Sequence, residues 1–226
     1  MTVTGTGFRT PTPLSLSQID RRLSHRVTTG VWWPAETDFE IAVGAVLTQN
    51  TAWTNVEHAL DNLRREGLLS APAITAADTA QLAELIRPAG YYNAKTRYLR
   101  QLAAWMSANH DRAHNLPTGR LRRALLSVTG IGPETADDIV LYVYNRPVFI
   151  FDLYARRMLT AAGYTVPAGY EAARRELSET LGVGSRDAQW HQRFHGLVVD
   201  AGKTARTRGW DSLLAPVAGE TTGHTR

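Results

Sequence analysis

Residues 126–136 hold a Gly-x-Gly turn, the first feature of the chain with clear chemical potential. The turn reads Thr-Gly-Ile-Gly-Pro-Glu-Thr over residues 129–135, and three arginines lie just upstream at positions 120, 122 and 123. Two glycines before a helix expose backbone N–H groups at the positive end of the helix dipole, which suits one phosphate group. A dinucleotide fingerprint would also need a preceding strand and a third glycine, and both are missing. The turn indicates either a single-phosphate grip or a tight helix–helix turn with surface arginines.

Asp152 is the second candidate, and it stands between apolar residues 148–151 and a helical pattern over residues 153–162. A carboxylate in that place is a favourable N-cap for the helix. The same carboxylate, near a phosphate-binding turn, could also face a positive charge that forms on a sugar. The two roles are compatible, and both stay open.

Aromatic side chains flank a helical pattern that begins at residue 38. Trp-Trp-Pro precedes it at residues 32–34, and Gln49, Asn50 and Trp53 follow it. A single tryptophan is more often a core residue than a ligand wall. Three of them around one helix, beside two polar side chains, favour a stacking pocket.

Two tyrosines mark a further loop, since Tyr91 and Tyr92 follow a Pro-Ala-Gly turn and precede Lys95, Arg97 and Arg100. This pattern suits a DNA-facing loop with an aromatic wedge and phosphate contacts. The alternative is a capped helix with a solvated basic face.

His191 and His195 have the i,i+4 spacing of two metal ligands. No third ligand is evident, and we expect no metal there.

The elements that must position these residues are helices. Apolar residues recur at helical spacing in almost every segment of useful length, with Gly or Pro at the ends. Asp38 is the expected N-cap of the second helix, and residues 147–151 are an extended connector, because no second strand is in reach. The expected helices cover residues 17–27, 38–48, 54–65, 75–87, 94–108, 119–128, 134–144, 153–162, 169–181 and 187–205. The sequence therefore predicts an all-α protein.

Composition excludes several classes of protein. The chain has 226 residues, a net charge of +4 and no cysteine, so disulfides, thiol nucleophiles and cysteine-held iron–sulfur clusters are excluded. Its apolar runs are far shorter than the roughly 20 residues that cross a bilayer. The amino end lacks the pattern of a secretory signal, and we expect a cytoplasmic protein of bacterial type that works on the nucleoid.

Together these residues resemble the helix-hairpin-helix DNA glycosylases of the endonuclease III superfamily, over residues 31–203. The similar motifs are the hairpin at residues 126–136, the catalytic-aspartate segment at 151–152, the second-helix motif at 46–50 and the lesion loop at 88–95. The resemblance implies an all-α, two-domain helix-hairpin-helix glycosylase fold with the active-site cleft between the domains and no iron–sulfur cluster. The implied division is a helical domain of residues 14–34 plus 148–214, a helical barrel domain with the hairpin at 35–147, and disordered tails at 1–13 and 215–226.

Two departures point to a branch of that family. Bifunctional members have a Schiff-base lysine where this chain has Glu134, and the only lysines, Lys95 and Lys203, fall in other segments. The chain also lacks the cysteines that hold the cluster of many members. The branch that it resembles most is 3-methyladenine DNA glycosylase III, through residues 32–34, 47–51, 87–93, 130–134 and 193–196. Leu197 departs from that branch, which has a lysine there.

The resemblance implies a monofunctional DNA glycosylase of base excision repair. Such an enzyme flips an alkylated, 3-methyladenine-type base out of double-stranded DNA and releases it hydrolytically, leaving an abasic site. Asp152 is the implied catalytic residue. The implied base pocket is Trp32, Trp33, Pro34 and Trp53, and the implied DNA contacts are Gln49, Asn50, Tyr91, Lys95, Gly130, Gly132 and Thr135. We expect a monomer without a cofactor, although Na⁺ or K⁺ could bind the Val128 and Ile131 carbonyls, as in many relatives.

Two other functions remain open. Gln49 and Asn50 could read the edge of an uncharged lesion, as in an endonuclease III-like glycosylase for uracil, mismatched thymine or oxidised pyrimidine. The second alternative belongs to a different class: the chain could be a non-catalytic helix-hairpin-helix DNA-binding protein. Glu134 would then mark an active site that has lost its function. The carboxylate of Asp152 argues against that second alternative.

Overall fold

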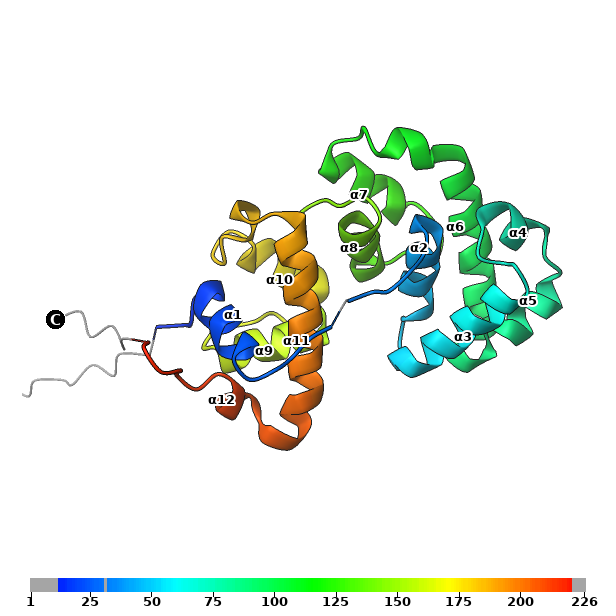
Figure 1. The fold of residues 1–226 in the computed structure, drawn as a ribbon. Helices are drawn as coiled ribbons and strands as arrows, with labels where there is room; N and C mark the ends of the chain where they lie inside the picture. The colour runs from blue at the N-terminus through cyan, green and yellow to red at the C-terminus, as the bar shows by residue number, and fades with distance from the viewer. Residues whose placement is uncertain (1–11, 31, 221–226) are drawn as a thin grey trace, which may run out of the picture. The chain divides into compact units, whose positions relative to one another are not determined.

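The computed structural model describes residues 12–30 and 32–220, and all regular elements in these ranges are helices (Figure 1). They are α1 (Leu16–Ser24), α2 (Asp38–Leu47), α3 (Trp53–Arg65), α4 (Ala71–Ala76), α5 (Thr79–Leu85), η1 (Arg87–Ala89), α6 (Tyr92–Ala113), α7 (Thr118–Leu126), α8 (Pro133–Tyr142), α9 (Leu153–Ala161), α10 (Tyr170–Leu177), η2 (Val183–Ser185), α11 (Ala188–Arg208) and α12 (Trp210–Leu213). The expected all-α fold is confirmed, with an extended connector at residues 147–151. Among the described residues no helix has both the length and the apolar character needed to cross a membrane.

The chain forms two compact units. The hairpin unit comprises residues 32–150 and 182–193, and the terminal unit comprises residues 12–30, 151–181 and 194–220. The expected division differs, because it grouped residues 32–34, 148–150 and 182–193 with the chain ends. Residues 182–193 belong to the hairpin unit because the Gln192 amide donates to the Leu141 carbonyl at 2.9 Å, and the Tyr142 hydroxyl donates to the Gln192 carbonyl at 3.3 Å.

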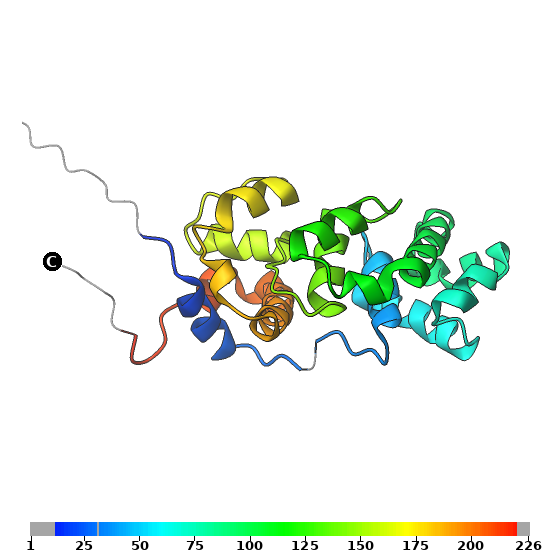
Figure 2. The same ribbon diagram turned by 90° about the horizontal axis from the view of Figure 1, so that it is seen from above.

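Helix α2 is the central helix of the hairpin unit, because nearly all its side chains are apolar or small and are buried. It contacts α3, α6 and α8, and both views show it beside α8 (Figures 1 and 2). Thr37, not Asp38, is its N-cap: the Thr37 hydroxyl accepts a hydrogen bond from the Glu40 N–H at 3.1 Å. The expected cap was wrong by one residue, because Thr37 has the extended backbone of a cap and Asp38 is already helical.

Residues 71–85 form two short helices, α4 and α5, where the sequence predicted one helix over residues 75–87. The break lies at Asp78, whose carboxylate accepts hydrogen bonds from the N–H groups of Ala80 and Gln81, both at 2.9 Å. The bond from the Gln81 N–H is the main cause that lowers the pKa of Asp78. Such local side-chain bonds to the backbone compete with a continuous helix.

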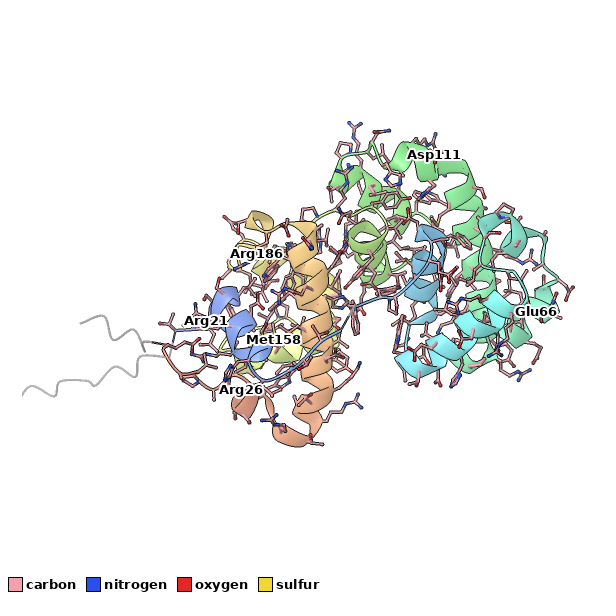
Figure 3. The ribbon with its side chains drawn as sticks, in the orientation of Figure 1. Arg21, Arg26, Glu66, Asp111, Met158 and Arg186 are labelled. Carbon is pink, nitrogen blue, oxygen red and sulfur yellow. The ribbon has the colours of Figure 1, made fainter. Side chains whose placement is uncertain are left out.

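The terminal unit packs around α9, where Met158 is fully buried (Figure 3). Asp152 is the N-cap of α9, as predicted, and its Oδ1 accepts a hydrogen bond from the Ala155 N–H at 2.6 Å. Residues 215–220, expected to be disordered, are held by a buried ion pair in which the Arg22 Nε lies 2.7 Å from the Glu220 carboxylate. At the other end, residues 12 and 13 of the expected tail are described, and Pro13 lies beside Gly163. The remaining tail residues, 1–11 and 221–226, lie outside the described residues.

The predicted hairpin joins α7 to α8 with Gly130 at its turn. Gly130 has a φ of +92°, and a Cβ there would lie 2.1 Å from the Tyr98 ring. The Ile131 N–H donates to the Val128 carbonyl at 3.0 Å. Pro133, a residue tolerated in the first turn of a helix, is the first residue of α8, one residue before the expected start. Gly132 has a φ of −84° and open space where a Cβ would stand. The two glycines of the motif therefore face different constraints.

The variants Gly130→Ala and Gly132→Ala test that difference. A methyl group at residue 130 would collide with Tyr98 and force an unfavourable φ, so we expect Gly130→Ala to lose about 2 kcal/mol or more of unfolding free energy. Gly132→Ala is the matched control and should stay within about 0.5 kcal/mol of the parent protein. Urea unfolding followed by circular dichroism measures both, and equal losses would contradict the packing of Tyr98 on the turn.

Candidate active site

The carboxylate of Asp152 is held from two sides within the terminal unit. Its Oδ1 accepts the hydrogen bond from Ala155, and its Oδ2 lies 3.8 Å from the Nε2 of His195 on α11. The Asp152 and His195 side chains are only 11% and 9% exposed. The N-terminus of α9 accommodates negative charge. The result is a fixed and nearly dehydrated carboxylate with one oxygen directed at an imidazole.

His195 is a candidate site residue that we did not expect at Asp152, because its distance from Asp152 in the sequence hides the contact. The only signal was its position in the Arg-Phe-His-Gly segment, residues 193–196. His191, considered with it as a metal pair, contacts the Val183 carbonyl through Nε2 at 3.0 Å. Burial is the main cause that lowers the pKa of His191, so this ring is neutral. In the described part of the chain, His191 and His195 belong to no group of three metal-ligating side chains.

The predicted aromatic pocket is an indole cluster in the hairpin unit. Trp32 stacks on Trp53 with ring centroids 6.3 Å apart and planes inclined by 28°, and Trp33 meets Trp53 edge-on at 5.5 Å. Tyr142, which we did not expect here, lies 4.9 Å from Trp33. Trp33 is buried, whereas Trp32 and Trp53 are half-buried and Pro34 is exposed. Trp32 and Trp53 are therefore the indoles that keep surface for a planar ligand.

Gln49 links the end of α2 to the hairpin. Its amide donates to the Gly130 carbonyl at 2.9 Å and to the Thr135 hydroxyl at 3.0 Å, and Thr135 is 4% exposed. Both residues were expected to contact DNA, but their polar groups bond to each other inside the protein. The link fixes the turn relative to α2 and leaves the exposed Asn50 as the candidate contact of this loop.

The structure contradicts the role that the sequence predicted for Lys95. We expected a phosphate contact, but the side chain is 1% exposed, and its ammonium donates to the carbonyls of Leu47, Gln49 and Ala89, each at 2.8 Å. Burial lowers the pKa of Lys95 to about 8, so the amine is mainly protonated at pH 7 and all three N–H groups can donate. Lys95 therefore positions two loops and is not a surface charge.

The two loops held by Lys95 carry strained residues. Asn50 has a φ of +53° and Tyr91 a φ of +48°, a backbone region that is costly for residues other than glycine. Tyr91 is 72% exposed, and both residues border a hollow of about 160 Å³. Strained backbone persists where surrounding bonds over-determine it. Lys95 bonds to the Gln49 carbonyl, next to Asn50, and to the Ala89 carbonyl, two residues before Tyr91. Tyr91 is therefore an exposed side chain beside a segment that a buried charge holds.

The hairpin end of α8 carries no amine. Glu134 is exposed in the first turn of α8, Lys95 is buried elsewhere, and Lys203 lies in the terminal unit, 2.9 Å from the Asp200 carboxylate. Of the upstream arginines, Arg122 is not at the surface: it forms a buried ion pair with Asp137 at 2.6 Å. Arg120 and Arg123 are exposed beside the hairpin.

Comparison with known proteins identifies the family. Residues 43–182 match the HhH-GPD superfamily of base excision DNA repair proteins. The chain belongs to this superfamily. It is 39% identical over 175 residues to a Methanocaldococcus jannaschii protein named as a candidate DNA repair glycosylase, a match that covers 75% of this chain and 78% of that protein. This chain is accordingly an HhH-GPD base excision DNA repair protein.

Solved structures agree with that assignment. The H. pylori 3-methyladenine DNA glycosylase bound to 1,N6-ethenoadenine superposes with a TM-score of 0.66 at 27% identity, covering 83% of this chain and 94% of the other. An endonuclease III in a non-covalent DNA complex superposes with a TM-score of 0.63 at 19% identity, covering 80% of each chain, and this match concerns the fold alone. The predicted resemblance to helix-hairpin-helix glycosylases is confirmed.

Replacing Lys95 with Met tests its positioning role in this HhH-GPD protein. Three buried carbonyls would lose a charged donor, so we expect Lys95→Met to lose about 3 kcal/mol or more of unfolding free energy in urea. Lys203→Met, at an exposed lysine, is the matched control and should stay within about 0.5 kcal/mol of the parent protein. Unchanged stability together with weaker DNA binding would instead indicate a phosphate contact.

Proposed function

We propose that this protein is a monofunctional glycosylase that hydrolyses the N-glycosidic bond of alkylated, 3-methyladenine-type bases and leaves an abasic site. The observation that carries the proposal is the buried Asp152 carboxylate, held by the Ala155 N–H and facing His195, in a chain without an amine at position 134. The substrate is double-stranded DNA, and we expect the enzyme to act as a monomer.

Asp152 would act on the sugar and on water. As the base leaves, positive charge develops on the deoxyribose, and a fixed carboxylate stabilises that charge without reorganising. The same group can orient or deprotonate the attacking water. His195 would act as a positioning residue, because it lies beside the Oδ2 that Ala155 leaves unused. The hydrolysis needs no metal or organic cofactor, and the Val128 and Ile131 carbonyls remain proposed ligands for a monovalent cation.

The absence of a Schiff-base amine supports hydrolysis over strand cleavage. A lyase step needs an amine that attacks the sugar carbon and stays covalently attached. Glu134 supplies a carboxylate where bifunctional relatives have a lysine. The two lysine side chains of the chain are engaged elsewhere, Lys95 with three carbonyls and Lys203 with Asp200.

The indole cluster supports a cationic base as substrate. An N3-methylated adenine carries positive charge and leaves readily, so recognition is harder than bond cleavage. An indole face attracts a cation by up to about 2 kcal/mol when water is excluded, and a normal base lacks this attraction. The half-buried Trp32 and Trp53 offer such faces. The H. pylori 3-methyladenine glycosylase, bound to another modified adenine, is a structural neighbour in line with this substrate class.

The chain differs from the 3-methyladenine DNA glycosylase III branch at one position, and its substrate range can differ accordingly. Leu197 stands where the branch has a lysine, and it is a core residue with 1% exposure. The alternative, an uncharged lesion read by hydrogen bonds at the base edge, is less supported, because the Gln49 amide is already bonded to Gly130 and Thr135.

A panel of damaged duplexes tests the activity. We expect release of methylated purines from alkylated DNA, strand breaks only after alkali, and no adduct trapped by borohydride, because the site has no amine. Base release by chromatography and strand scission with and without alkali are the measurements. Breaks without alkali or a trapped adduct would overturn the monofunctional proposal, and preferred release of uracil or oxidised pyrimidine would overturn the substrate class.

The variant Asp152→Asn tests the catalytic carboxylate. Asparagine is also a good N-cap, so α9 should keep its start while the charge is lost. We expect base release to fall by at least about a hundredfold, with affinity for abasic-site DNA within a few-fold of the parent. Asp78→Asn, at the exposed N-cap of α5, is the matched control and should keep full activity. A fully active Asp152→Asn protein would contradict the assignment.

A further inference from the structure

Three metal-ligating side chains meet in the hairpin unit, where the C-terminal end of α6 meets the start of α2. They are Asp38, His110 and His114, and one ligand atom from each lies within 4.8 Å of those from the other two. Within the described ranges, these side chains are the only such group of three. Asp111, labelled in Figure 3, marks this end of α6. None of the three side chains belongs to the candidate active site.

The distance between two of the ligand atoms is near that of a metal-bound pair. The His110 Nε2 lies 3.5 Å from the Asp38 Oδ2. Two ligands of a tetrahedral zinc ion, each at roughly 2.0–2.1 Å from the metal, lie roughly 3.3 Å apart. His114 is exposed at the C-cap of α6, so its side chain has room to complete the site. Its ring meets that of His110 edge-on, with centroids 4.9 Å apart.

The hydroxyl of Tyr144 lies behind His110, on the side of the ring away from Asp38. The His110 Nδ1 lies 3.3 Å from the hydroxyl of Tyr144, which is 4% exposed. A histidine that binds a metal through Nε2 carries its proton on Nδ1 and usually donates it to an outer partner. The Tyr144 oxygen can accept that hydrogen bond, and the Tyr144 ring packs against both imidazoles, at 5.6 and 4.9 Å. This contact orients His110 with Nε2 toward Asp38.

The site is accessible from solvent, because the Asp38 side chain is 45% exposed, the His110 side chain is 29% exposed and His114 is exposed. His110 also lines a hollow of about 570 Å³, together with other residues of α4 and α6 and with Phe39. Water can supply a fourth ligand. Two imidazole nitrogens and one carboxylate oxygen suit zinc-like divalent ions, whereas magnesium and calcium prefer oxygen ligands alone.

We propose that Asp38, His110 and His114 bind one zinc-class divalent cation, with Tyr144 as the outer partner of His110. The ion would join the end of α6 to the start of α2. Binding therefore stabilises the folded protein and does not depend on base release, so this proposal stands or falls separately from the proposed function.

The test uses the full chain after chelator treatment, without DNA. Zn²⁺ titrated in a calorimeter should bind with one equivalent per chain and raise the melting temperature. Co²⁺ should bind at the same site with the visible absorption of a tetrahedral complex, and Zn²⁺ should displace it. His114→Ala, at an exposed position, should fold normally and lose both the saturable binding and the thermal shift. His58→Ala, at an exposed histidine of α3, is the matched control and should keep both.

Further variants separate this site from adventitious binding. Asp38→Asn should also lose the thermal shift. Tyr144→Phe should weaken Zn²⁺ binding by about tenfold without abolishing it, as outer-partner substitutions do. Absence of binding by the parent protein, or equal binding by the parent, His114→Ala and Asp38→Asn, would overturn the proposal. Base release by His114→Ala should equal that of the parent.

Discussion

The buried ammonium of Lys95 is the interaction on which the hairpin unit depends. It donates to three carbonyls, those of Leu47 at the end of α2, of Gln49 in the loop that follows and of Ala89 at the end of η1. An ammonium group without such acceptors could not remain charged at 1% exposure. Asn50 and Tyr91, both with left-handed backbone, lie beside the segments whose carbonyls Lys95 binds. Gln49, in one of those segments, in turn bonds to the hairpin turn. A single charge thus connects the end of α2, the exposed Tyr91 and the start of α6.

At Asp152 the observed structural role and the proposed chemical role use different oxygens of one carboxylate. Its function as the N-cap of α9 uses one carboxylate oxygen and fixes the side chain in one rotamer. The other oxygen is left to face His195 in a nearly dry environment. A catalytic group gains from this arrangement, because a carboxylate that is already oriented does not need to reorganise when charge develops on the substrate. The N-cap role is therefore compatible with the proposed catalytic role, and the sequence alone does not separate the two.

Several features could be predicted because they depend on neighbours along the chain. Helical periodicity, the Gly130 turn and the cap at Asp152 are local, and each was confirmed. The break of the expected helix at Asp78 was missed although its cause is local, because the apolar pattern continues across it. Lys95 was misassigned because a lysine beside arginines on a helix suggests solvent, and only packing shows that this one turns inward.

The sequence by itself determined the helical fold class, the hairpin, the superfamily and the absence of any cysteine-held cluster, because these follow from residue types and short spacings. Only the tertiary structure decided which polar side chains form hydrogen bonds inside the protein and which remain exposed to a ligand. Two such groups join residues that are far apart in the chain: His195 lies beside Asp152, and Asp38 lies beside His110 and His114. Their proximity depends on how helices pack, and packing is set by the sum of many buried contacts, which no short motif encodes.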